Sequence, residues 1–178
     1  MLTGTPVALP EMLARREARA AEQAELLARW HAPLISFCLN IPGPVKTTPA
    51  LRRLFDDGLA QIHARLARNG YAIRAEQERH AATGDECLLA AAGDAAALKE
   101  QMTSIEDAHP LGRLFDIDVI DAASEKLSRP APRLCLLCGR QAQDCARSRR
   151  HSVEELTAHI EMRLRAYEIQ KRSAASSD

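Results

Sequence analysis

The order of apolar segments along the chain is the feature that most restricts its fold. Four short apolar or alternating runs predict strands, and two longer amphipathic segments between them predict helices. The expected strands are 34–41, 71–80, 87–92 and 114–120, and the expected helices are 49–69 and 95–108. This order is the split βαβ pattern, and it predicts an α+β protein with a ferredoxin-like βαββαβ core. We expect an antiparallel sheet with two helices on one face, in which the first and last strands are neighbours.

Capping residues support the expected helix boundaries. Thr47 or Thr48 is suited to begin the first core helix, and Asp94 is suited to begin the second. Ser152 and Glu155 have the spacing of a capping box, which predicts a further helix after the core.

The whole chain, 1–178, is expected to form a single domain. Its expected parts are an N-terminal surface helix at 10–30, a core at about 34–129 that ends in a short extra strand at 125–129, a Cys- and Arg-rich segment at 130–151, a C-terminal helix at 152–172 and a disordered tail at 173–178.

Charge and composition restrict the partners that we expect. The 24 basic and 24 acidic residues balance, so no general attraction to nucleic acid or to a membrane surface is predicted. No apolar run is long enough for a transmembrane helix, and residues 1–10 lack the features of a secretory signal. With five cysteines and no such signal, the protein is expected in the reducing cytoplasm.

Two aspartates interrupt the last apolar strand. Side chains alternate along a strand, so Asp116 and Asp118 are expected on one face, with Phe115, Ile117 and Val119 on the other. Two neighbouring carboxylates repel each other unless a cation lies between them, and Mg²⁺ prefers such oxygen ligands. The pattern therefore predicts a magnesium site, and a solvated strand face is the alternative.

A cysteine-rich segment follows the core. Cys135, Cys138, Cys145 and His151 supply the ligand types of a Cys₃His zinc site, although only the first pair has the usual spacing. Packed thiols in a compact loop are the alternative. Residues 126–151 also contain seven Lys or Arg residues and one acidic residue, which predicts a local anion-binding surface or a contact for an acidic partner, with a solvated basic loop as the alternative.

Several motifs together resemble a known family. They are His-Pro-Leu-Gly-Arg-Leu-Phe-Asp-Ile-Asp-Val at 109–119, Arg-Leu-Cys-Leu-Leu-Cys at 133–138, Cys-Ala-Arg at 145–147, Pro-Gly-Pro-Val-Lys at 42–46 and Arg-Arg-Leu-Phe at 52–55. In combination they are similar to the apo-citrate lyase phosphoribosyl-dephospho-CoA transferases, over about residues 9–164.

The resemblance implies a reaction. Such an enzyme joins 2′-(5″-triphosphoribosyl)-3′-dephospho-CoA to a serine of the acyl-carrier subunit of apo citrate lyase through a phosphodiester, and it releases diphosphate. This is nucleotidyltransferase-type chemistry on a nucleotidyltransferase-like palm, for which Mg²⁺ would hold the triphosphate and offset charge on the departing diphosphate.

The resemblance also suggests roles at the aspartate motif. We expect Asp116 and Asp118 to hold Mg²⁺ and to assist deprotonation of the serine. Arg113 and Lys46 are expected to neutralise the diphosphate. His109 is expected to contact phosphate or act as a general base, with a loop-capping role as the alternative.

The remaining candidates are arginines. Arg52 and Arg53 are weaker candidates for binding the diphosphate. Arg147, Arg149 and Arg150 are expected to contact either the phosphates of the precursor or an acidic carrier protein.

Two other functions remain open from the sequence. The same prosthetic group could be transferred to the carrier protein of a malonate decarboxylase. Alternatively, the chain could be a zinc-stabilised protein-binding module without catalytic activity.

Overall fold

The computed structural model describes residues 2–175. Its elements are α1 (Leu9–Trp30), β1 (Leu34–Leu39), α2 (Pro49–Arg68), β2 (Ile73–Ala81), β3 (Gly84–Ala91), α3 (Ala95–Ala108), the 3₁₀ turn η1 (Gly112–Leu114), β4 (Phe115–Ile120), α4 (Ala142–Arg147) and α5 (Val153–Ala175).

The four strands form one antiparallel sheet in the order β2-β3-β1-β4. The α+β class and the pairing of the first strand with the last are therefore as predicted. β1 lies inside the sheet, which explains its nearly continuous apolar sequence. β4 lies at an edge, so one side of its backbone must find hydrogen-bond partners outside the sheet.

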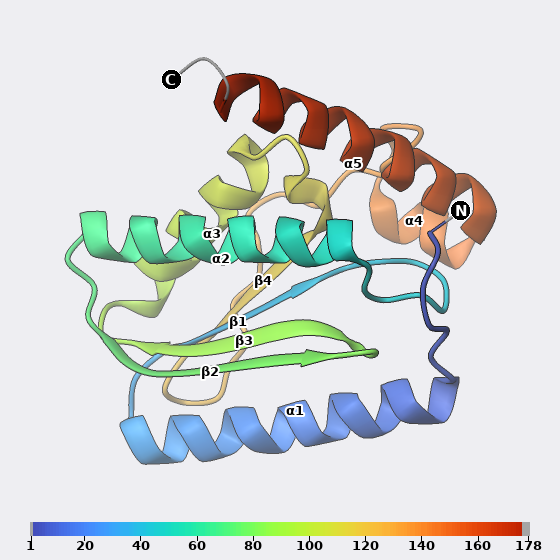
Figure 1. Cartoon of the computed structure of the whole chain (residues 1–178). Coiled ribbons are helices and arrows are strands. Elements are labelled where there is room, and N and C mark those ends of the chain that lie inside the picture. Colours follow the sequence, from blue (N-terminus) through green and yellow to red (C-terminus); the bar gives the residue numbers. More distant parts are fainter. Residues whose placement is uncertain (1, 176–178) are drawn as a thin grey trace.

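Helices cover both faces of the sheet (Figure 1). On the face covered by α2 and α3, the ring of Phe37 stacks on Phe55 at 4.9 Å between centroids and meets the edge of Phe115 at 5.4 Å. On the opposite face, Leu26 and Leu27 of α1 pack against a smaller apolar cluster. The N-terminal helix is therefore a layer of the fold that covers the second face of the sheet.

The predicted caps are present. The Thr48 hydroxyl accepts a hydrogen bond from the Leu51 amide at 3.2 Å, and the Asp94 carboxylate accepts one from the Ala97 amide at 2.8 Å. Ser152 forms the reciprocal box at the start of α5. Its amide donates to the Glu155 carboxylate at 2.8 Å, and its hydroxyl accepts the Glu155 amide at 3.1 Å.

Several expected boundaries are wrong. Residues 125–129 form no strand. The Asp121 carboxylate accepts the Ala123 and Glu125 amides and closes a tight turn, after which the chain makes only a bridge between Ile120 and Lys126 and one bond from the Leu127 amide to the Val119 carbonyl. The cysteine-rich segment contains the unpredicted helix α4. The last helix continues to Ala175, past the expected start of the tail at 173, and residues 176–178 lie outside the described part.

Within residues 2–175, no helix is both long enough and apolar enough to cross a membrane.

Candidate functional site

β4 presents both aspartates on one face of the sheet, as predicted. Asp116 pairs with Cys38 of β1, and Asp118 pairs with Ser36. The intervening Ile117 is fully buried on the other face, together with Phe115 and Val119. The alternation of β4 thus places two carboxylates on the partly open side while its apolar side chains complete the core.

A groove of about 720 Å³ runs along the outer edge of β4 and includes both aspartates. Basic side chains also line it: Lys99, Arg113, Lys126, Arg129 and Arg133. Asp118 forms an ion pair with Lys126 at 2.5 Å, and a nitrogen of Arg133 lies 3.9 Å from Asp116. The groove therefore combines metal-binding oxygens with an excess of positive charge, which suits a polyphosphate with a divalent cation.

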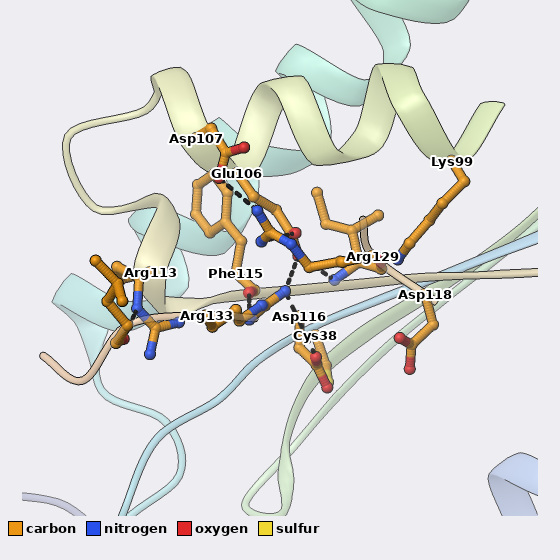
Figure 2. A network of polar contacts seen from close by, with 12 residues as sticks. Cys38, Lys99, Glu106, Asp107, Arg113, Phe115, Asp116, Asp118, Arg129 and Arg133 are labelled. Carbon is orange, nitrogen blue, oxygen red and sulfur yellow. Dashed lines mark hydrogen bonds and ion pairs between the residues drawn. The ribbon is translucent and has the colours of Figure 1, made fainter. Parts of the chain in front are cut away.

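Charged side chains supply three hydrogen bonds along the free edge of β4 (Figure 2), and the Leu127 amide donates to the Val119 carbonyl at 2.9 Å. The Ile117 amide donates to Glu106 at 2.9 Å, and the Ile117 carbonyl accepts from Lys99 at 2.9 Å. Arg133 donates to the Phe115 carbonyl at 2.7 Å. The edge strand is thus held by side chains of α3 and of the segment after the sheet, and the backbone between the two aspartates is fixed on its outer side.

Glu106 is the centre of this edge network. It is only 4% exposed, and it contacts Arg133 directly and Arg129 at 2.8 Å. Burial raises the pKa of the Glu106 carboxyl, while Arg133, the Ile117 amide and Arg129 oppose that change. Burial lowers the pKa of the Lys99 ammonium. Opposite charges are therefore packed together beside the groove, with little access to water.

The sequence reasoning missed Lys99 and Glu106. Both lie on the buried side of α3, at helical spacing from Met102. A charged residue on an otherwise apolar helix face was the sequence signal that could have identified them. Arg133 was recognised only as part of a motif, and the groove-lining Arg129 was counted only in the basic segment.

The other side of Asp116 faces α1. The Cys38 thiol lies 3.9 Å from the Asp116 carboxylate, and Arg19 of α1 lies 3.4 Å from the Cys38 sulfur. Burial, with the nearby Asp116 charge, raises the pKa of the Cys38 thiol to about 12. Cys38 therefore stays protonated near neutral pH. Arg19 was not predicted as a site residue, because nothing in its local sequence shows that α1 crosses this face.

Gly112 allows the aspartate strand to approach α3. A Cβ atom at Gly112 would lie 2.7 Å from the carbonyl carbon of Glu106 and would collide with the carbonyl oxygen. The glycine of the Pro-Leu-Gly-Arg motif therefore serves close packing of η1 on the end of α3.

His109 does not line the groove. It is buried on the face covered by α2 and α3, where its Nε2 atom lies 3.1 Å from Asp57 and 3.0 Å from the Tyr167 hydroxyl. Its Nδ1 atom accepts the Leu111 amide at 3.0 Å, so the proton of the neutral ring is on Nε2. Burial lowers the pKa of His109. These contacts match the loop-capping alternative.

Three other predicted phosphate contacts also lie outside the groove. Lys46 donates to the Ile41 carbonyl at 2.7 Å. Arg52 pairs with Asp56 at 2.8 Å, and Arg53 contacts Glu168 of α5. The structure thus does not bring these residues together with the aspartates.

The three arginines near the end of the cysteine-rich segment are exposed. Arg147 ends α4, and Arg149 and Arg150 follow it in the turn before α5, with Arg149 at φ +46°. None of them lines the aspartate groove. They form a separate basic surface beside it.

The predicted Cys₃His residues converge. The ligand atoms of Cys135, Cys138, Cys145 and His151 all lie within 4.8 Å of one another. A tetrahedral zinc site with bonds of about 2.3 Å to sulfur has ligands at comparable separations. The Nε2 atom of His151 is buried and has no hydrogen-bond partner within residues 2–175. The donor set, its spacing and this unpaired nitrogen all fit a zinc ion.

Comparisons with known proteins give a consistent result. Residues 7–167 match the family model described as apo-citrate lyase phosphoribosyl-dephospho-CoA transferase. A probable apo-citrate lyase phosphoribosyl-dephospho-CoA transferase of Vibrio cholerae serotype O1 (strain M66-2) is 44% identical over 160 residues, which cover 87% of this chain and 90% of the relative. The corresponding transferases of Escherichia coli O139:H28 (strain E24377A / ETEC) and Shigella boydii serotype 18 (strain CDC 3083-94 / BS512) are each 39% identical over 159 residues, with 87% of both chains covered.

Proposed function

Because the chain belongs to the apo-citrate lyase phosphoribosyl-dephospho-CoA transferase family, we propose that it attaches the prosthetic group of citrate lyase. The substrate is 2′-(5″-triphosphoribosyl)-3′-dephospho-CoA, and the acceptor is a serine of the apo acyl-carrier subunit. The products are the phosphoribosyl-dephospho-CoA phosphodiester on that serine and free diphosphate.

The groove along β4 is the observation that supports this reaction most strongly. A triphosphate needs positive charge along its length and oxygen ligands for its metal ion. The groove offers both, since Asp116, Asp118 and five basic side chains line it, and Lys126 and Arg133 lie within 4.0 Å of the aspartates. The notable excess of cations over these two carboxylates matches a substrate that brings its own negative charge.

The two aspartates are the residues that would hold Mg²⁺. Their carboxylates share one strand face, and Asp116 is 40% exposed, so both can take part in a shell completed by water and phosphate oxygens. The bound ion would supply charge neutralisation for the triphosphate and for the departing diphosphate.

The chain's own residues perform the rest of the transfer. The serine oxygen attacks the α-phosphorus, the bond from that phosphorus to the bridging oxygen of the β-phosphate breaks, and diphosphate leaves. We assign Asp116 as the group that accepts the serine proton, because it is the more exposed of the pair. Arg113, Arg133 and Lys126 neutralise the departing diphosphate. His109 is assigned a positioning role, because its buried contacts lie elsewhere.

We assign the core to the ferredoxin-like, nucleotidyltransferase-type palm. The strand order β2-β3-β1-β4, all antiparallel, supports that assignment, as do the two helices α2 and α3 on one face. In this arrangement the aspartates project from the opposite face, next to α1.

We further propose that the Cys₃His cluster holds a structural zinc ion. Its role would be to fix the segment that contains Arg133, which lies two residues before Cys135 and contacts β4. A site built on three thiolates requires reducing conditions, and for this reason we place the protein in the cytoplasm.

The exposed basic surface of Arg147, Arg149 and Arg150 is assigned to docking of the acidic carrier protein. Its three side chains are exposed and do not line the groove. Rim charges of this kind accelerate association with a partner of opposite charge.

A competition between two carriers tests the proposed acceptor. Equal amounts of apo citrate lyase carrier and apo malonate decarboxylase carrier are incubated with the protein, the triphosphoribosyl precursor and Mg²⁺, and labelled carrier is separated by electrophoresis. We expect modification of the citrate lyase carrier alone. Preferential modification of the malonate decarboxylase carrier would replace the proposed acceptor, and no modification of either would favour the zinc-stabilised binding module.

A further inference from the structure

A second cavity shares a wall with the aspartate groove. It has a volume of about 390 Å³ and lies between η1, residues 131–136 and α5. This volume falls within the usual range for small-ligand pockets, about 300–1,000 Å³. Arg113, Arg129 and Arg133 line both the cavity and the groove. The two hollows are therefore adjacent and share three arginines.

Three buried nitrogen atoms around this cavity have no partner within residues 2–175. They are Nη1 of Arg113, Nε of Arg129 and Nε2 of His159. A buried donor without an acceptor is unfavourable, and more so where the group is charged. A ligand with several acceptor oxygens would satisfy the two guanidinium nitrogens, which can only donate.

The charges around the cavity also favour an anion. Arg113 has no carboxylate within ion-pair distance in the described residues, and its side chain donates only to the Leu134 carbonyl, at 2.7 Å. Its pKa is lowered by burial and by the charges of Arg133 and Arg129. Asp107 at the rim is already paired with Arg129 at 2.5 Å. Arg129 and Arg133 are paired with Glu106, so an anion would supply the counter-charge that Arg113 lacks.

The rest of the wall is apolar. Its apolar residues include Pro110, Leu111, Leu114, Leu134, Leu136 and Ile160. A free inorganic anion would leave this surface without a contact. The combination fits a phosphate group attached to a larger, partly apolar body.

We propose that this cavity binds the diphosphate of the dephospho-CoA half of the substrate, with the neighbouring pantetheine chain on the apolar wall. This inference rests on the proposed transfer reaction. The precursor has two separate phosphate groups: the triphosphate that reacts and the diphosphate that links adenosine to pantetheine. The groove takes the first and the cavity takes the second, and the shared arginines line both.

Leu134 provides a charge-reversal test. It lines the cavity and is 55% exposed, so a polar replacement does not disrupt the core. Binding of dephospho-CoA to the zinc-loaded full chain is measured by calorimetry. A carboxylate near the diphosphate should repel it, so L134E should bind about tenfold more weakly. L134K should bind at least as tightly as the unchanged protein. M162E is the control, because Met162 is exposed on α5 and does not line the cavity.

The outcomes separate this inference from the proposed reaction, because dephospho-CoA lacks the triphosphate and cannot be transferred. D118N should retain dephospho-CoA binding. Equal affinities for L134E and L134K, or no binding of dephospho-CoA by a protein that modifies its carrier, would overturn the cavity assignment and leave the reaction intact. A charge-dependent affinity in a protein without transfer activity would support the cavity and overturn the reaction. Pantetheine and inorganic diphosphate, titrated separately, should each bind more weakly than dephospho-CoA.

Discussion

Glu106 accepts a hydrogen bond from the backbone amide of Ile117 at 2.9 Å, although the two residues belong to α3 and β4. Ile117 stands between the two aspartates, so this bond fixes the backbone from which both carboxylates project. The same carboxylate contacts Arg133 and Arg129, which line the groove. One buried acid therefore joins the edge of the sheet to the cations beside the candidate active site.

Replacing Glu106 should destabilise the protein strongly. In E106A the Ile117 amide loses its acceptor, Arg133 loses its close ion pair and Arg129 keeps only the exposed Asp107, so we expect a loss of roughly 3 kcal/mol in the free energy of unfolding. E106Q keeps an acceptor and should lose less. D107N is the control, because Asp107 is 64% exposed and its pairing with Arg129 should contribute less than about 1 kcal/mol. Urea unfolding measures all three, and similar losses for E106A and D107N would contradict this account of the edge.

Gly112 should tolerate no side chain. In G112A the new Cβ would meet the backbone of Glu106, so α3 and η1 would have to move apart. We expect a loss of about 1–3 kcal/mol, as for other overpacked sites. P110A, in the same turn, is the comparison. Thermal unfolding measures the melting temperature of both variants. A G112A variant that melts at the temperature of the unchanged protein would refute the packing argument.

Local signals predicted the parts of the fold that depend on neighbours in sequence. Alternation placed Asp116 and Asp118 on one face, and the caps at Thr48 and Asp94 set the starts of two helices. The expected strand at 125–129 was wrong: the Asp121 carboxylate closes a turn at 121–125, a contact that apolar patterning does not register, and only a single bridge to β4 follows the turn.

The site was less predictable than the fold because its charged groups come from distant segments. Glu106 and Arg133 meet only after α3 and the segment following β4 are both packed along the sheet edge. The same reasoning explains His109, which is close to the aspartates in sequence but lies on the other face of the sheet. The convergence of Cys135 and His151 likewise follows from α4 and its turns, not from the spacing of the ligands.

Removal of zinc should disorganise the groove as well as the cysteine-rich segment. We expect about one zinc ion per chain by elemental analysis, and its loss in C145A. Because the segment holds Arg133 against the Phe115 carbonyl, transfer activity should fall with metal content. C87A is the matched control, since Cys87 is a free, buried thiol outside the cluster. Full zinc content in C145A, or full activity in the metal-free protein, would contradict the proposed structural role.

His109 should make stability fall in mildly acidic solution. Its folded-state pKa lies below the ordinary value of 6.5, so the unfolded chain binds a proton that the folded chain resists. Stability from this group is therefore complete above about pH 6.5 and declines as the pH drops towards the lowered value, by at most about 1.4 kcal/mol per pH unit.

The groups around His109 do not obscure this effect. Asp57 and Tyr167 contact the ring, and Lys171 pairs with Asp57 at 2.5 Å. The pKa of Asp57 is lowered below its ordinary range and that of Tyr167 is raised above its own, so neither titrates between pH 7 and about pH 5.5. H109Q should lose less stability over this interval than the unchanged protein. Parallel urea curves at the two pH values test this, and identical losses would remove His109 as the cause.

The central claim is that the β4 aspartates catalyse attachment of the prosthetic group, and intact-mass analysis of the carrier tests it most directly. Apo citrate lyase carrier is incubated with the protein, the triphosphoribosyl precursor and Mg²⁺, in parallel with D116N, D118N and E125Q. Glu125 is exposed and lies outside the groove, so E125Q is the control. We predict a mass gain equal to one phosphoribosyl-dephospho-CoA group with the unchanged protein and with E125Q. We expect none with the two folded aspartate variants. An unmodified carrier, or full modification by D116N and D118N, would contradict the account.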